Sequence, residues 1–314
     1  MEKIHHSYVE IRGLKLHLAE IGNGGGPVVI FLHGFPEIWY SWRYQMVAAA
    51  NAGFRAIAPD FRGYGLSELP ADPENTTFKD LVDDILGILD FFQFHKVFLV
   101  GKDFGARVAH HFALLHQERI FAVVTLGLPF LPSGPEAFPI HLLPKGFYML
   151  RWREPGRPEK DFGRFPVKTV VKNIYILFSG SELPVANDEE QEIMDMVDPS
   201  TPLPPWFREE DLHQYAALYE KSGFQTALQV PYRAWLEEYG VNHLKINVPN
   251  LLIMGGKDYA MKFGGLGDYI TSGKVKEFVP DLQVNFIQEG THFVQEQFPE
   301  EVNDLVINFL KKHT

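Results

Sequence analysis

One acidic residue, Asp103, stands between two glycines where a buried apolar stretch gives way to a helical pattern. The stretch from Gly101 to Gly105 reads glycine, any residue, nucleophile, any residue, glycine, with aspartate in the usual position of a serine. The two glycines permit the tight turn that would lift residue 103 above a sheet. A simpler interpretation is an aspartate that caps the helix, which is common. The motif alone leaves both interpretations open.

Two further residues follow Asp103 in the chain order of a catalytic triad, nucleophile, then acid, then histidine. Asp258 comes just after one buried strand, and His292 just after the last strand. The carboxyl ends of parallel strands meet at one edge of a sheet, where such folds place their sites. Asp258 would orient His292 and stabilise its charged form. Each alone could be a turn or loop residue, but their joint placement favours a triad.

The segment His33-Gly34-Phe35-Pro36 also follows a central strand directly. The backbone N–H groups of Phe35 and Phe104 are expected to form an oxyanion hole above the nucleophile. The Phe35-Pro36 bond is a candidate for a cis peptide. A plain turn is the alternative interpretation of this segment.

An aspartate nucleophile indicates attack at saturated carbon. A serine would form an ether, whereas a carboxylate forms an alkyl ester that water activated by His292 can hydrolyse. Strained epoxides and alkyl halides are substrates of this kind. Opening an epoxide creates an alkoxide, which a tyrosine can protonate while remaining neutral near pH 7. A departing halide needs only hydrogen-bond donors.

The elements that must position these residues alternate between strands and helices, which predicts an α/β fold with a mostly parallel sheet and helices on both faces. Apolar strand patterns occupy residues 27–32, 54–60, 97–101, 120–126, 248–255 and 284–287. Residues 9–18 predict a β-hairpin, and residues from about 299 to 312 a final helix.

The alternation breaks after Leu128 and resumes at Val248. The intervening stretch is rich in proline and aromatic residues, with weakly helical segments. We therefore expect a core domain made of residues 1–128 and 248–314, and an inserted, mostly helical cap (lid) domain at 129–247.

The composition of the chain argues against several kinds of partner and excludes several kinds of site. The 314-residue chain has a net charge of −11, which disfavours nucleic acid and anionic membrane surfaces as partners, and it has no apolar run long enough to span a membrane. It has no cysteine, so disulfides, cysteine–zinc sites and a thiol nucleophile are excluded. No metal or organic cofactor is expected.

The N-terminal residues lack the pattern of a signal peptide, and a cytoplasmic location is expected. The sequence leaves a monomer and a homodimer open.

With these motifs in place, the chain resembles the plant and vertebrate soluble epoxide hydrolases of the α/β-hydrolase fold, and above all the plant cytosolic form. The matching stretches are residues 31–37, 41–43, 58–65 and 290–293. The resemblance implies an eight-stranded sheet, a helical cap, and the conversion of lipophilic epoxides to vicinal diols through an ester on Asp103. Small epoxides and water would be the only partners.

The resemblance further implies two cap tyrosines that donate to the epoxide oxygen. The stretch Trp152 to Gly156 points to Tyr148, four residues before it, and the stretch Pro231-Tyr232-Arg233 points to Tyr232. Tyrosines that merely pack in the core are the alternative. Substrate contacts are expected from Phe35, Trp42, Tyr148, Tyr232 and Phe293.

The chain departs from its relatives beside the nucleophile. The family usually has His-Asp-Trp, whereas this chain has Lys102-Asp103-Phe104. Alternation along the strand predicts that Lys102 points away from the direction of Asp103. Phe104 keeps its backbone N–H but changes the pocket wall.

Two alternative functions stay open. A haloalkane or haloacid dehalogenase would share the aspartate and the triad, although Phe104 lacks the ring N–H with which a tryptophan binds halide. A non-catalytic ligand-binding protein on the same fold is the other alternative, and Lys102 and Phe104 motivate it.

Overall fold

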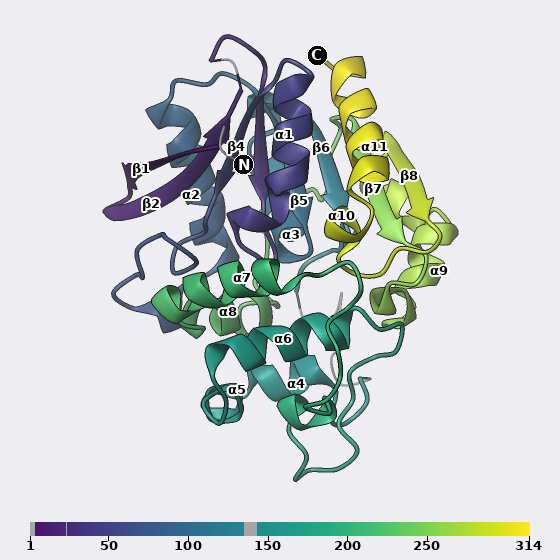
Figure 1. The fold of residues 1–314 in the computed structure, drawn as a ribbon. Coiled ribbons are helices and arrows are strands. Elements are labelled where there is room, and N and C mark those ends of the chain that lie inside the picture. The colour runs from purple at the N-terminus through teal and green to yellow at the C-terminus, as the bar shows by residue number, and fades with distance from the viewer. Residues whose placement is uncertain (1–3, 23, 135–142) are drawn as a thin grey trace.

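An eight-stranded sheet forms the centre of the molecule (Figure 1), which we describe from a computed structural model for residues 4–22, 24–134 and 143–314. The strands are β1 His5–Ile11, β2 Leu14–Ile21, β3 Val28–Leu32, β4 Arg55–Pro59, β5 Val97–Lys102, β6 Ile120–Leu126, β7 Asn250–Gly255 and β8 Leu282–Ile287. They are ordered β1-β2-β4-β3-β5-β6-β7-β8. β1, β2 and β4 pair antiparallel, and all other neighbours pair parallel. The predicted mostly parallel sheet is confirmed.

Helices cover both faces of this sheet and also gather beyond one of its ends. They are α1 Arg43–Asn51, α2 Phe78–Phe91, α3 Phe104–Leu115, α4 Tyr148–Arg153, α5 Arg157–Phe162, α6 Val167–Phe178, α7 Glu209–Ser222, α8 Gln225–Leu228, α9 Leu266–Thr271, α10 Val294–Gln297 and α11 Pro299–Lys312. Helices α1 and α11 pack together on one face, and α2 and α3 on the other (Figure 1). The final helix has the predicted bounds.

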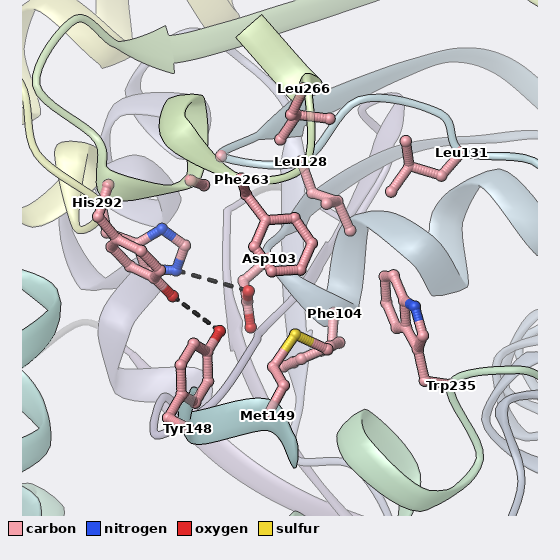
Figure 2. A pocket seen from close by; sticks show the side chains of 13 residues that line it. Asp103, Phe104, Leu128, Leu131, Tyr148, Met149, Trp235, Phe263, Leu266 and His292 are labelled. Atoms are coloured by element: carbon pink, nitrogen blue, oxygen red, sulfur yellow. Dashed lines mark hydrogen bonds and ion pairs between the residues drawn. The ribbon is translucent and has the colours of Figure 1, made fainter. Parts of the chain in front are cut away.

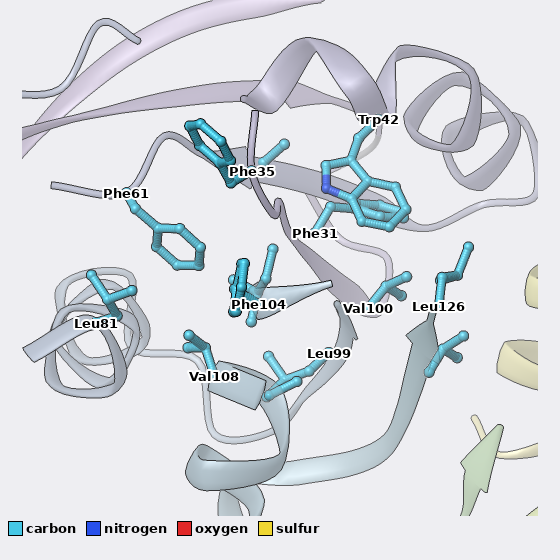
Figure 3. Packing of buried hydrophobic residues seen from close by; sticks show 14 of the residues in the cluster. Phe31, Phe35, Trp42, Phe61, Leu81, Leu99, Val100, Phe104, Val108 and Leu126 are labelled. Atoms are coloured by element: carbon cyan, nitrogen blue, oxygen red, sulfur yellow. The ribbon is translucent and has the colours of Figure 1, made fainter. Parts of the chain in front are cut away.

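The central strands are buried because helices cover them on both sides. Every residue of β3 and β5 is buried, which is why their sequences are nearly continuous apolar runs. Figure 3 shows Phe31 and Val100 of these strands packed among Trp42, Leu99 and neighbouring side chains. This packing fixes the ends of the strands, from which the site residues project.

Helices α4 to α8 lie between β6 and β7 in the chain and form a layer across one end of the sheet (Figure 1). No residue of the described parts of this insertion, 127–134 and 143–249, belongs to the sheet. β6 and β7 are nevertheless direct neighbours in it. The insertion therefore interrupts the sequence but not the sheet. The division into a core domain (1–128 and 248–314) and a cap domain (129–247) stays a prediction.

A buried polar cluster joins the inserted helices to the core. Glu296 of α10 forms an ion pair with Arg43 of α1. The same carboxylate accepts hydrogen bonds from the hydroxyls of Tyr175 and Tyr215, at 3.1 and 3.0 Å. These tyrosines belong to α6 and α7, so one carboxylate links three parts of the chain. Because Glu296 follows His292 by only four residues, the cluster also anchors the loop that carries the histidine.

Candidate active site

Asp103 stands at the junction of β5 and α3 with a strained backbone. Its φ of 53° and ψ of −121° lie outside the conformations that residues with a side chain commonly adopt. The carboxylate does not make the hydrogen bond to the second or third helical N–H that a capping aspartate would make. The interpretation of Asp103 as a simple helix cap is therefore wrong, and the turn presents its side chain to a pocket (Figure 2).

Glycines allow the chain to pass close to itself around this turn. A Cβ on Gly105 would lie 2.2 Å from the carbonyl oxygen of Leu32, and one on Gly34 would lie 2.6 Å from Cβ of Asp103. Real Cβ atoms do not approach other atoms so closely. The loop after β3 can therefore lie against the nucleophile turn only because these positions lack side chains.

Two backbone N–H groups point at the Asp103 carboxylate. The N–H of Phe35 donates to Oδ1 at 3.2 Å, and the backbone of Phe104 supplies a second hydrogen bond. These are the two groups predicted from the sequence to form an oxyanion hole. The Phe35-Pro36 bond is cis, as predicted. Together the donors can stabilise negative charge on an oxygen of residue 103.

His292 lies between the two carboxylates. Its Nδ1 is 3.1 Å from both oxygens of Asp258, and its Nε2 is 3.5 Å from Oδ2 of Asp103. Burial and the Lys102 ammonium act to lower the pKa of His292, but the two carboxylates outweigh them and raise it to about 9. Burial acts to raise the pKa of Asp103, but its contacts with His292 and Lys102 hold it below its ordinary range. The three residues have the geometry of a triad.

Lys102 lies inside the site, contrary to the prediction that it points away. Its side chain is fully buried, and its Nζ is 3.0 Å from Nε2 of His292. Alternation fixes only the direction in which a side chain leaves a strand. The flexible four-carbon stem of a lysine can still carry its ammonium back toward the site.

The two tyrosines predicted from the insertion lie side by side, and Tyr148 lines the same pocket as Asp103. Tyr148 begins α4, and Tyr232 lies in a π-helical turn, Gln229–Arg233; their ring centroids are 6.1 Å apart. Burial, with a smaller contribution from the charge of Asp103, raises the pKa of both phenols above the ordinary value. Both are therefore neutral proton donors at physiological pH.

A third tyrosine at this point was not predicted. The hydroxyl of Tyr259 lies 3.0 Å from that of Tyr148, and its ring centroid lies 5.1 Å from that of His292. The only sequence signal is its position directly after Asp258. Such a position does not reveal a partner 111 residues away in the chain.

The pocket over these residues has mostly apolar walls. Asp103, Tyr148, Tyr259 and His292 supply its polar groups. Its other walls are Phe104, Gly127, Leu128, Leu131, Met149, Trp235, Ala260, Phe263 and Leu266. A small lipophilic molecule with one polar atom would match this lining.

Some side chains expected to contact substrate lie behind these walls. Trp42 is fully buried and packs on Phe31 in the core (Figure 3). It is not one of the residues that line the pocket, so that expectation finds no support. Phe293 is also buried and stacks on Tyr175. The Phe35 ring packs against Trp152 and Tyr232.

In the described residues we find no group of three His, Cys, Asp or Glu side chains arranged to hold a metal ion. Nor does any helix there combine the length and apolarity needed to cross a membrane.

Comparison with known proteins identifies the family. Residues 27–299 match the family model of the alpha/beta hydrolase fold. "Epoxide hydrolase 3" of Siraitia grosvenorii is 38% identical over 99% of this chain and 100% of its own length. The chain belongs to the epoxide hydrolases of the alpha/beta hydrolase fold. Its cytoplasmic location and its oligomeric state stay predictions.

Further relatives and solved structures agree. "Epoxide hydrolase A" of Mycobacterium tuberculosis is 31% identical, with 96% of each chain covered. The crystal structure of an epoxide hydrolase from Vigna radiata superimposes on this enzyme with a TM-score of 0.91, at 37% identity and 99% coverage of both chains. Epoxide hydrolase I of potato gives a TM-score of 0.88 at 32% identity, covering 99% of this chain and 100% of its own.

Proposed function

We propose that this enzyme converts lipophilic epoxides to vicinal diols through a covalent ester on Asp103. One observation carries the proposal: an ionised carboxylate on the core and the neutral phenol of Tyr148 from the insertion line one apolar pocket, and the neutral phenol of Tyr232 lies beside Tyr148. An epoxide needs both groups at once, a nucleophile for its carbon and a proton donor for its oxygen.

In the first half of the reaction, Asp103 attacks one epoxide carbon. The bond between that carbon and the ring oxygen breaks as the new ester bond forms. Tyr148 and Tyr232 donate hydrogen bonds to the departing oxygen, and one of them supplies its proton. Burial keeps these phenols protonated, and the contact with His292 keeps Asp103 ionised.

In the second half, His292 removes a proton from water, which attacks the ester carbonyl of Asp103. Asp258 orients the imidazole and stabilises its charged form. The negative oxygen of the tetrahedral intermediate is stabilised by the N–H groups of Phe35 and Phe104. The acyl C–O bond then breaks, and the diol leaves with the proton returned by His292. The second proton of the water, left on the Asp103 carboxyl, passes to the tyrosinate, so that the carboxylate and both phenols are regenerated.

The pocket walls support a lipophilic substrate. Seven of the lining residues have side chains without a hydrogen-bond donor for a hydrocarbon or aryl group to displace: Phe104, Leu128, Leu131, Met149, Ala260, Phe263 and Leu266. Fatty-acid, terpenoid and styrene-type epoxides all fit this chemistry. The paired tyrosines favour these substrates over alkyl halides, because a halide leaves without a proton.

The test is product formation by purified enzyme with styrene oxide and, in parallel, 1-chlorohexane. We expect phenylethanediol from the epoxide and no chloride from the haloalkane. Asp103→Asn should reduce diol formation by about 10⁴-fold or more, because a nucleophile acting within a triad dominates catalysis. Chloride release without diol would identify a dehalogenase, and binding without either product a ligand-binding protein.

A further inference from the structure

A buried ammonium shares the catalytic histidine with the nucleophile. Nζ of Lys102 lies 3.0 Å from Nε2 of His292, closer than Oδ2 of Asp103, which lies 3.5 Å away. Nε2 is the atom that must accept the proton of the hydrolytic water in the proposed reaction. Lys102 is therefore in direct contact with the general base.

The hydrogen-bonding capacity of the two groups restricts their protonation. An ammonium only donates, so Nε2 must present its lone pair to it. This hydrogen bond can form only while the imidazole is neutral, with its one proton on Nδ1, where the Asp258 carboxylate accepts it.

The groups facing His292 come from every surrounding element. Asp258 and Tyr259 approach from the segment after β7, and Asp103 and Lys102 from the end of β5. Glu37, from the loop after β3, and Glu296 of α10 complete the charged surroundings. In the free enzyme the carboxylates dominate and the histidine pKa is about 9.

The ester intermediate changes this balance. Esterification removes the charge of Asp103, and with it one of the interactions that raise the histidine pKa. The Lys102 ammonium stays in place and opposes a second positive charge beside it. The effect of Lys102 on the histidine pKa is therefore least opposed in the ester intermediate, the stage where a neutral histidine is required.

We propose that Lys102 is a positioning residue for ester hydrolysis. Its ammonium, beside Nε2, opposes protonation of His292 once Asp103 has become an ester, so that the histidine is neutral when Nε2 has to accept the proton of the hydrolytic water. Lys102 acts on His292 rather than on the substrate, and the inference rests on the proposed function.

The test separates the two half-reactions in single-turnover experiments on wild type, Lys102→Met and Lys102→Arg. Formation and decay of the ester are followed by rapid quenching and intact mass. Methionine keeps an unbranched chain without the charge, and arginine keeps the charge. In Lys102→Met, the acidic limb of the ester-decay profile should move to higher pH by about one to three units. The ester should accumulate near pH 7, while Lys102→Arg should restore most of the wild-type limb.

A second measurement does not depend on a variant of the lysine. In Asp103→Asn, residue 103 is uncharged, as it is in the ester. ¹⁵N NMR should then show His292 neutral at pH 7, with the proton on Nδ1. An imidazolium at pH 7 in this protein would overturn the inference, and so would an unchanged decay profile in Lys102→Met. If wild type forms no ester at all, the proposed function itself fails.

Discussion

The two sides of the site, which we call the floor and the roof, have opposite effects on the pKa values of their ionisable groups. The floor consists of Lys102, Asp103, Asp258 and His292, which project from the ends of strands, and each is stabilised by an opposite charge or a hydrogen bond. The roof consists of Tyr148 and Tyr232, which are buried among aromatic rings. The pKa of Asp103 is lowered, and the pKa values of both phenols are raised.

This difference shows how one pocket can hold a base and an acid at the same pH. Groups whose surroundings push their pKa values apart can take opposite roles. The pKa values in the floor depend on ion pairs, and so on the charges of neighbouring groups. The pKa values of the phenols in the roof depend on their burial away from water. Substitutions in the two regions should therefore have different effects on the activity and stability of the enzyme.

Among substitutions that leave Asp103 in place, removal of the roof hydroxyls should have the largest effect. The double variant Tyr148→Phe/Tyr232→Phe keeps the ring packing but leaves the epoxide oxygen without a donor. Diol formation, measured as kcat/KM, should fall by about 10³-fold or more, because general-acid assistance of this kind is large. Decay of any ester that does form should change little. More than a tenth of wild-type activity in the double variant would contradict the role of the roof.

Glu37, whose carboxyl interacts with Lys102, Asp103 and His292 of the floor, should make the stability of the fold depend on pH. Burial, together with the carboxylates of Glu296 and Asp103, raises the pKa of Glu37 from 4.5 to about 7 although Lys102 opposes this. A carboxyl with a raised pKa stabilises the fold below its unfolded value, and this contribution is lost as pH rises through about 7. From about pH 4 to pH 8, Glu37→Gln should gain stability relative to wild type by up to about 3 kcal/mol. Urea denaturation at the two pH values measures this gain, and a pH-independent difference would contradict it.

The contact between Tyr259 and Tyr148 should have the smallest effect. Tyr259→Phe removes a hydrogen bond worth about 1 kcal/mol, so the rate of ester formation should fall about fivefold. Tyr269→Phe is a matched control, because the buried Tyr269 hydroxyl is one for which the structure gives no hydrogen-bond partner. Equal effects of the two variants on ester formation would show that the Tyr259 hydroxyl does not act through Tyr148.

The sequence predicted the floor better than the roof. Buried strands are recognisable as apolar runs, and residues at their ends must lie together because parallel strands end at one edge. Chain order could therefore associate Asp103, Asp258 and His292. Tyr148 and Tyr232 lie on short helices without a strong periodic pattern, and only the family resemblance nominated them.

The errors involve contacts that local sequence does not determine. Lys102 reaches His292 because its long stem bends back, whereas alternation concerns only the first bond of a side chain. Trp42 was expected to contact substrate, yet it packs in the core beside Phe31. Tyr259 contacts Tyr148 because the fold brings two distant segments of the chain together. The positions of Met149 and Trp235 in the pocket wall likewise depend on how the insertion packs on the core.

The most direct test of the nucleophile is the fate of oxygen in a single turnover. Excess enzyme is mixed with an aryl epoxide in H₂¹⁸O, and the diol and the peptide containing Asp103 are analysed by mass spectrometry. If Asp103 forms the ester, the diol takes its new oxygen from the carboxylate and stays unlabelled, while ¹⁸O enters Asp103. Label in the diol and none in Asp103 would mean that water attacks the epoxide directly, and would contradict the covalent mechanism.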